Sequence, residues 1–149
     1  MAGVERRAEA VWQGNLKDGQ GTITQVGSGA FGALPVTWAA RTGESDGKTS
    51  PEELLAAAHA ACFSMAFSNE LAKAGHTPER MDVQAVCNFA PKPEGGWGVA
   101  SMTLTARGKV PGIDDGEFQR IGGLAKAGCP ISGALKGNVE INLKATLEQ

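Results

Sequence analysis

The sequence has few cysteines and no strong excess of either charge. Its 14 Lys and Arg residues against 16 Asp and Glu residues give a formal net charge of -2 over 149 residues. That balance is unlike a polybasic nucleic-acid binder or an acidic tail. Three cysteines, an odd and sparse set, do not make a disulfide framework. We therefore expect no nucleic-acid partner and no disulfide scaffold.

Long apolar runs are also missing. No uninterrupted run approaches the ~20 residues that span a bilayer. Residues 1–13 contain Glu5, Arg6, Arg7 and Glu9 and lack the apolar stretch of a secretory signal. We expect a cytoplasmic protein without a membrane partner, whose cysteines start as thiols. The length and the 42% hydrophobic content fit a single domain over residues 1–149.

The N-terminal third predicts three short antiparallel strands separated by glycine-rich turns: Ala8 to Gln13, Gly21 to Val26 and Leu34 to Arg41. A long helix follows, since Ser50 can cap it, Pro51 suits its first position and Glu53 completes a capping box. No breaker follows until Gly75. A helix that is apolar on most sides is usually buried all round, and a domain this small has little room to enclose one. We therefore predict a homodimer.

The remaining sequence predicts two strands, a helix and a closing strand. Apolar residues alternate from Met81 to Phe89, and a second strand covers Trp97 to Val110. A helix begins near Asp114 and ends at Gly128. Cys129 and Pro130 then start a short helical turn that stops near Gly137. The last strand covers Val139 to Leu147. The predicted fold is α+β, with the order β-β-β-α-β-β-α-β and a long buried central helix.

The three cysteines occupy different kinds of position. Cys62 lies in the middle of the alanine-rich helix, where a cysteine often serves as a small hydrophobe. Cys129 lies where a new helix begins, and the partial positive charge of a helix N-terminus favours a thiolate. Cys87 shares the apolar face of its strand with Val83 and Phe89, so we interpret it as a core residue.

Glu52 and Arg41 stand close to the start of the long helix. Ten helical residues separate Glu52 from Cys62, roughly 15 Å, so the two cannot touch within one subunit. If two copies of the helix pack antiparallel in a dimer, Glu52 of one copy approaches Cys62 of the other. Arg41 can then bridge carboxylate and thiolate and lower the pKa of the thiol. The alternative is a solvated arginine and a helix-terminal glutamate.

Other chemistries have weaker support. His59 precedes Cys62 by three residues and shares its helix face, so a cysteine–histidine hydrolase or acyl transferase is possible. No motif supplies the oxyanion hole or the third group that such an enzyme needs. No CxxC or HxxxH spacing indicates a zinc site, and the glycine-rich segments lack the Lys-Ser or Lys-Thr of a phosphate loop.

Two cysteine motifs carry a resemblance to a known family. The run from Pro51 to Ser68 around Cys62, and Lys126-Ala-Gly-Cys129-Pro-Ile-Ser132, closely resemble the osmotically inducible protein C branch of the OsmC/Ohr family. The likeness covers essentially the whole chain, including Trp12-Gln-Gly14 and Arg41. It implies the OsmC-like fold and an intertwined homodimer with active sites at the subunit boundary.

The resemblance also implies a function. It matches Cys62 to the peroxidatic cysteine and Cys129 to the resolving cysteine of a thiol peroxidase, and Arg41 and Glu52 to the pair that activates the thiolate. The implied substrates are organic hydroperoxides and, less efficiently, hydrogen peroxide, without metal, flavin or haem. An external dithiol, on a lipoylated or thioredoxin-like protein, is the implied reductant. The alternative is a non-catalytic dimer that binds a small apolar ligand at the subunit interface.

Overall fold

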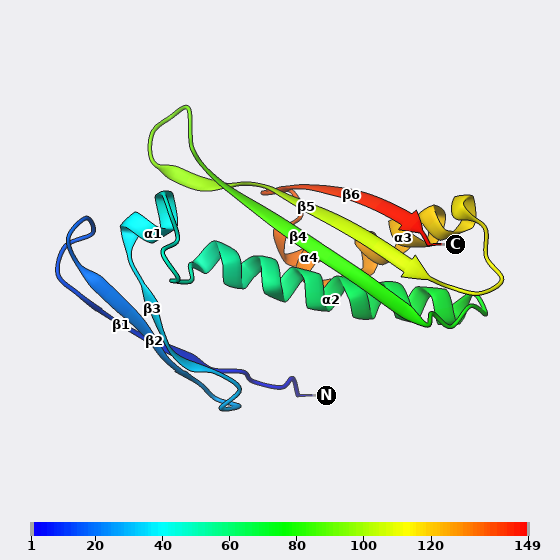
Figure 1. The fold of residues 1–149 in the computed structure, drawn as a ribbon, viewed down its shortest axis with the longest axis horizontal. Helices are drawn as coiled ribbons and strands as arrows, with labels where there is room; N and C mark the ends of the chain where they lie inside the picture. Colours follow the sequence, from blue (N-terminus) through cyan, green and yellow to red (C-terminus); the bar gives the residue numbers. More distant parts are fainter. Residues whose placement is uncertain (1, 149) are drawn as a thin grey trace. The chain divides into compact units, whose positions relative to one another are not determined.

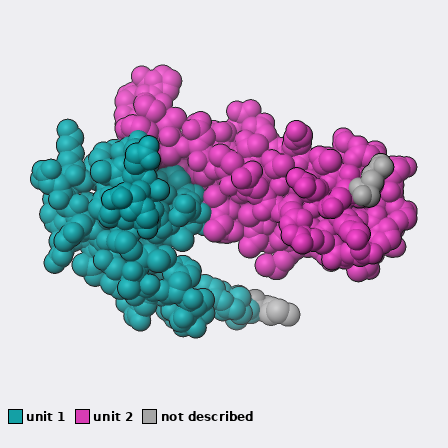
Figure 2. All heavy atoms as spheres, in the orientation of Figure 1, with its two compact units in different colours: residues 1–54 teal, residues 55–149 magenta. Residues whose placement is uncertain are grey.

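The structure is a computed structural model that describes residues 2–148 (Figure 1). By the contacts within the chain, it divides into two compact units, residues 1–54 and 55–149 (Figure 2). The single domain predicted over residues 1–149 stays a prediction. No helix among the described residues is long and apolar enough to cross a membrane.

The first unit carries an antiparallel sheet in the order β1-β2-β3. Strands β1 (Ala8–Gln13) and β2 (Gln20–Val26) agree with the sequence prediction, and β3 spans Gly32–Val36. All six residues of β1 are exposed. The buried hydrophobic side chains among residues 2–148 all lie between Phe63 and Val139, so this sheet has no hydrophobic core of its own within one chain.

The third strand is shorter than predicted, which changes the position of Arg41. The strand ends at Val36, and residues Trp38–Thr42 form helix α1. The Thr37 side chain caps this helix by accepting a hydrogen bond of 3.1 Å from the Ala40 backbone N–H. The threonine cap and the two alanines in this segment, Ala39 and Ala40, favour helix over strand. Arg41 therefore lies in the last turn of a helix and not at the end of a strand.

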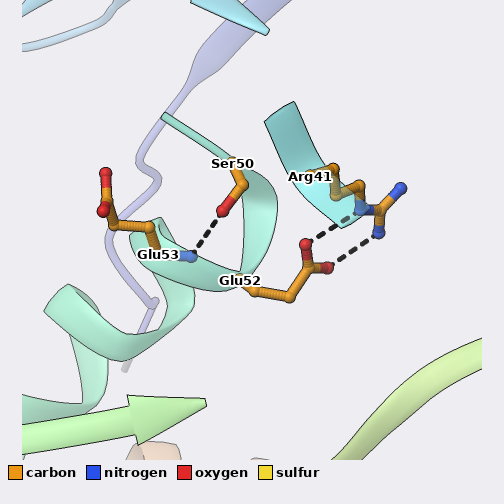
Figure 3. A network of polar contacts seen from close by, with 4 residues as sticks. All are labelled: Arg41, Ser50, Glu52 and Glu53. Atoms are coloured by element: carbon orange, nitrogen blue, oxygen red, sulfur yellow. Dashed lines mark hydrogen bonds and ion pairs between the residues drawn. The ribbon is translucent and has the colours of Figure 1, made fainter. Parts of the chain in front are cut away.

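The long helix α2 spans Pro51–Lys73. Its predicted cap is present, since the Ser50 hydroxyl accepts the Glu53 N–H at 3.1 Å (Figure 3). The Glu53 carboxylate accepts a bond from the Thr49 hydroxyl at 2.9 Å, in place of the returning bond of a capping box. Beyond the helix, Gly75 adopts a φ of 87°, a left-handed conformation that suits glycine and ends the helix.

The second unit contains a mixed sheet in the order β4-β5-β6. Strands β4 (Arg80–Pro91) and β5 (Trp97–Lys109) are antiparallel, and β6 (Glu140–Leu147) runs parallel to β5. Helices α3 (Asp115–Gly128) and α4 (Pro130–Leu135) form the crossover between β5 and β6. These positions confirm the predicted strands and helices of this part, and the Asp114 side chain caps α3 by accepting the Glu117 N–H at 2.8 Å.

The core of this unit lies between helix α2, helix α3 and the sheet. Phe63, Phe67 and Leu71 of α2 are fully buried, and Phe67 stacks on Phe118 of α3 with ring centroids 4.7 Å apart. The opposite face of α2 is open, since Met65 is 69% exposed. The helix is therefore buried on one face within a single chain. The α+β class is confirmed, whereas the intertwined homodimer stays a prediction.

Candidate active site

Two thiols from distant parts of the sequence meet in the second unit. Cys62, in the middle of α2, and Cys129, at the start of α4, have Sγ atoms 3.3 Å apart. Both are free thiols. Cys129 is the N-cap of α4 and Pro130 follows it at the first position, as the sequence predicted. At this separation a small shift of either side chain would bring the sulfur atoms to the ~2.05 Å of a disulfide bond.

The two thiols differ in their access to solvent. Cys129 is 1% exposed, whereas Cys62 is half-buried. Cys62 lines a groove of about 550 Å³ whose walls are mainly apolar residues of α2, of the end of α3 and of the start of α4; they include Ala58, Ala61, Met65, Ala66 and Ile131. Cys129 does not line this groove. A dissolved molecule therefore reaches the Cys62 sulfur first.

The surroundings shift the two pKa values in opposite directions. Burial raises the pKa of Cys62, a hydrogen bond from the backbone of Ile131 lowers it by less, and the contact with Cys129 adds to the raising effect. Burial alone would raise the pKa of Cys129, but hydrogen bonds from the backbone and hydroxyl of Ser132, from Cys62 and from the backbone of Ile131 lower it below its usual range. Within one chain, Cys129 is therefore the more acidic of the two thiols.

A buried hydrogen bond joins two residues that are close in sequence to Cys62 and Cys129. His59 of α2 and Ser132 of α4 are 0% and 3% exposed, and His59 Nε2 lies 2.8 Å from Ser132 Oγ. Burial lowers the pKa of His59, which keeps the ring neutral. The histidine therefore bonds Ser132, and the geometry does not support its use as a base for Cys62. Sequence reasoning missed Ser132, although its position three residues after Cys129 in a new helix was a usable signal.

Arg41 and Glu52 form an ion pair within the first unit (Figure 3). Arg41 Nε and one terminal nitrogen donate to the two carboxylate oxygens of Glu52 at 2.9 and 2.8 Å. The Arg41 guanidinium also lies over the Trp38 ring, 5.8 Å from its centroid. The Glu52 side chain is 9% exposed and that of Arg41 31%. The hydrogen bond to Glu52 raises the pKa of Arg41, so the guanidinium remains charged.

The structure thus assembles the four predicted residues as two pairs, Cys62 with Cys129 and Arg41 with Glu52. Cys87 lies on β4, half-buried and paired in register with Met102 of β5. Two contacting thiols, one of them open to an apolar groove, are an arrangement that thiol–disulfide chemistry requires.

The chain belongs to the OsmC-like protein family, whose model matches residues 43–144. It is 39% identical to peroxiredoxin OsmC of Escherichia coli over 93% of this chain and 95% of that protein. Its fold is similar to that of an organic hydroperoxide resistance protein from Elizabethkingia anophelis, with a TM-score of 0.76 and 26% identity over 99% and 100% of the two chains. OhrB of Bacillus subtilis has a similar fold, with a TM-score of 0.72 and 22% identity over 94% and 98%.

Proposed function

We propose that this protein is a two-cysteine peroxidase that reduces organic hydroperoxides, and hydrogen peroxide more weakly, to alcohols or water. The observation that carries the proposal is the 3.3 Å contact between the groove-lining Cys62 and the buried Cys129. The names of its relatives, a peroxiredoxin and organic hydroperoxide resistance proteins, support the same reaction. The proposed setting is oxidative and osmotic stress defence in the cytoplasm.

In the first step the Cys62 thiolate attacks the terminal oxygen of the hydroperoxide. The O–O bond breaks, an alcohol leaves after taking up a proton, and Cys62 becomes a sulfenic acid. The exposure of the two sulfur atoms supports this assignment, because Cys62 lines the groove and Cys129 is 1% exposed. The apolar groove walls suit the alkyl part of an organic hydroperoxide, which hydrogen peroxide lacks.

In the second step Cys129 attacks the sulfur of the sulfenic acid. The S–O bond breaks, water leaves and a Cys62–Cys129 disulfide forms. The short distance between the sulfur atoms supports this step, since little movement is needed. An external dithiol, on a lipoylated or thioredoxin-like protein, then reduces the disulfide by thiol exchange and restores both thiols.

The proposed active unit is a homodimer in which Arg41 and Glu52 of one copy activate Cys62 of the other. A pKa of Cys62 that burial raises leaves little thiolate, so a nearby cation is needed for attack on peroxide. The bidentate bond to Glu52 would hold the guanidinium in one orientation. The exposed Met65 on α2 and the sheet of the first unit offer apolar surface for a second copy to cover.

A second candidate is a non-catalytic dimer that binds a small apolar ligand at the subunit interface. The observation in its favour is the apolar groove beside Cys62. The ligand-binding hypothesis predicts that all three cysteines stay titratable after one equivalent of hydroperoxide. The peroxidase hypothesis predicts that the same treatment removes two titratable thiols per chain.

Steady-state turnover of cumene hydroperoxide with an excess of a dithiol tests the proposal. We expect the wild type to turn over repeatedly and Cys62→Ser to be inactive, because no sulfenic acid can form. Cys87→Ser is the matched control and should retain wild-type turnover, since Cys87 is half-buried on β4 and outside the thiol pair. Full multiple-turnover activity in Cys62→Ser would overturn the proposal.

A further inference from the structure

His59 and Ser132 form a buried polar contact that the proposed reaction does not use. His59 lies one helical turn before Cys62 on α2, and Ser132 lies in the first turn of α4, three residues after Cys129. Their side chains meet at 2.8 Å although both are almost completely excluded from solvent. A buried polar pair of this kind joins two helices that each carry one of the redox cysteines.

The tautomer of His59 follows from the atoms that surround its ring. Nδ1 is buried and has no hydrogen-bond partner among the described residues. Nδ1 therefore stays unpaired in either tautomer, as a donor or as an acceptor. A proton on Nε2 instead donates to Ser132 Oγ at 2.8 Å. Only the Nε2–H tautomer leaves the Ser132 hydroxyl proton free to donate to a second acceptor, so this tautomer permits one more hydrogen bond than the Nδ1–H tautomer.

We propose that His59 is a positioning residue for the resolving step, which orients the Ser132 hydroxyl so that it donates a hydrogen bond to the Cys129 sulfur. Two contacts support this role: His59 Nε2 lies 2.8 Å from Ser132 Oγ, and Cys129 Sγ lies 3.3 Å from Cys62 Sγ. Ser132 follows Cys129 by three residues in the first turn of α4. This inference rests on the proposed two-cysteine reaction.

The hydrogen bonds from His59 to Ser132 and from Ser132 to Cys129 would stabilise the Cys129 thiolate. The Ser132 hydroxyl and backbone both lower the pKa of Cys129, against the effect of burial. A hydrogen bond donated to a thiolate favours the charged form, so its loss raises the pKa. The thiolate then attacks the Cys62 sulfenic sulfur, the S–O bond breaks, and the hydroxide leaves as water with the proton that Cys129 gave up. Neither His59 nor Ser132 gains or loses a proton overall.

Two substitutions at His59 separate a donor role from a packing role. His59→Gln places an amide N–H donor near the position of Nε2, whereas His59→Asn places its donor near Nδ1, where no partner lies. We expect the Gln variant to behave like the wild type. The Asn variant and Ser132→Ala should share one defect, because each removes the same hydrogen bond.

The first measurement is the pH titration of the Cys129 thiolate by ultraviolet absorbance, in a Cys62→Ser, Cys87→Ser background. His59→Asn and Ser132→Ala should reduce the thiolate fraction near neutral pH about tenfold, equal to one pKa unit upward. Lys126 and Lys136, which line a groove with Ser132, are the charged groups from α3 and from the end of α4 and are unchanged in all variants.

The second measurement is the decay of the Cys62 sulfenic acid after one equivalent of cumene hydroperoxide, with trapping by dimedone in chains that keep all three cysteines. Sulfenic acid should form at the wild-type rate in every variant. The disulfide should form roughly threefold more slowly in His59→Asn and Ser132→Ala, because a less acidic thiol gives less thiolate but a more nucleophilic one.

Ser64→Ala is the control, since the Ser64 hydroxyl bonds the Ala61 carbonyl of its own helix at 2.8 Å. It should change neither measurement. Unchanged titration and disulfide formation in both His59→Asn and Ser132→Ala would overturn the inference, as would an equal defect in His59→Gln. Absence of sulfenic acid in the wild type would instead overturn the proposed function, and the titration would still decide the role of His59.

Discussion

Cys62 and Cys129 differ in exposure and in the groups around their sulfur atoms, and these differences support separate tasks. Cys62 lines the groove, and its pKa is raised by burial. Cys129 is buried beside the donors of Ser132 and Ile131, which lower its pKa. In the proposed reaction, the half-buried Cys62 thiol therefore needs an activating cation from elsewhere, whereas the buried Cys129 thiol has neighbouring donors that favour its thiolate.

Replacing Cys129 should stop the proposed reaction after the Cys62 sulfenic acid has formed. We expect Cys129→Ser to consume about one equivalent of hydroperoxide per chain and then stall, because the Cys62 sulfenic acid has no partner thiol. Excess peroxide should convert it to sulfinic acid, which mass spectrometry detects as a second added oxygen on Cys62. Continued turnover of this variant with a dithiol would show that Cys129 is not required for resolution.

The Arg41–Glu52 pair should stabilise the protein more than a solvated ion pair does. Arg41→Ala leaves the Glu52 carboxylate buried without its partner, at a cost of roughly 1–3 kcal/mol in the free energy of unfolding. Lys48→Ala is the matched control, because the Lys48 side chain is also 31% exposed but its partner Asp46 is 86% exposed. Lys48→Ala should lower the free energy of unfolding, measured in urea, by less than about 1 kcal/mol. Equal losses in the two variants would contradict the account.

At the scale of single elements, helix α3 contains two adjacent glycines in opposite surroundings. A Cβ on Gly122 would lie 3.1 Å from the Phe67 ring, and Phe67 is held between Phe63 and Phe118. A Cβ on Gly123 would meet nothing within 4 Å. The same helix therefore offers one position that resists a methyl group and one that accepts it.

These glycines give a paired prediction. Gly123→Ala should stabilise the protein by roughly 0.5–1 kcal/mol through helix propensity. Gly122→Ala gains the same propensity but overpacks the core, at a cost of roughly 1–3 kcal/mol. Thermal and urea unfolding should place Gly122→Ala clearly below Gly123→Ala in stability. The reverse order would show that Phe67 can move aside.

Most elements could be predicted from the sequence because local signals agree with the fold. The Ser50 cap, the alternation in β4 and the Cys129–Pro130 helix start all appear where the pattern placed them. Helix α1 was missed because its five residues are too few for a periodic pattern, and only the Thr37 cap marks it. The contacts of Cys62 with Cys129 and of His59 with Ser132 join residues about seventy positions apart, which local patterns do not encode.

At the scale of the whole molecule, the single chain leaves apolar surface uncovered in each unit. The first unit exposes Val11 and Trp12 by 55% and 41%, and the second exposes Met65 by 69%. A sheet without a buried face gains little hydrophobic stabilisation, since stability scales with apolar area removed from water. A second copy that covers these faces agrees with the proposed homodimer.

A negative charge introduced at Met65, on the exposed face of α2, should therefore disrupt the proposed homodimer. We expect Met65→Glu to shift the protein from dimer to monomer in sedimentation experiments and to lose peroxidase activity in parallel, because it would bury an unpaired carboxylate. Val86→Glu is the control, since Val86 is 51% exposed on β4 and alternates with the inward residues of that strand. A monomeric Met65→Glu with full activity would contradict an active site shared between copies.

The most direct test of the central claim is a count of thiols before and after one equivalent of organic hydroperoxide, with mass spectrometry to locate the new bond. We expect two of the three thiols per chain to disappear and a Cys62–Cys129 disulfide to account for both. Three titratable thiols after treatment, or a disulfide that includes Cys87, would contradict it.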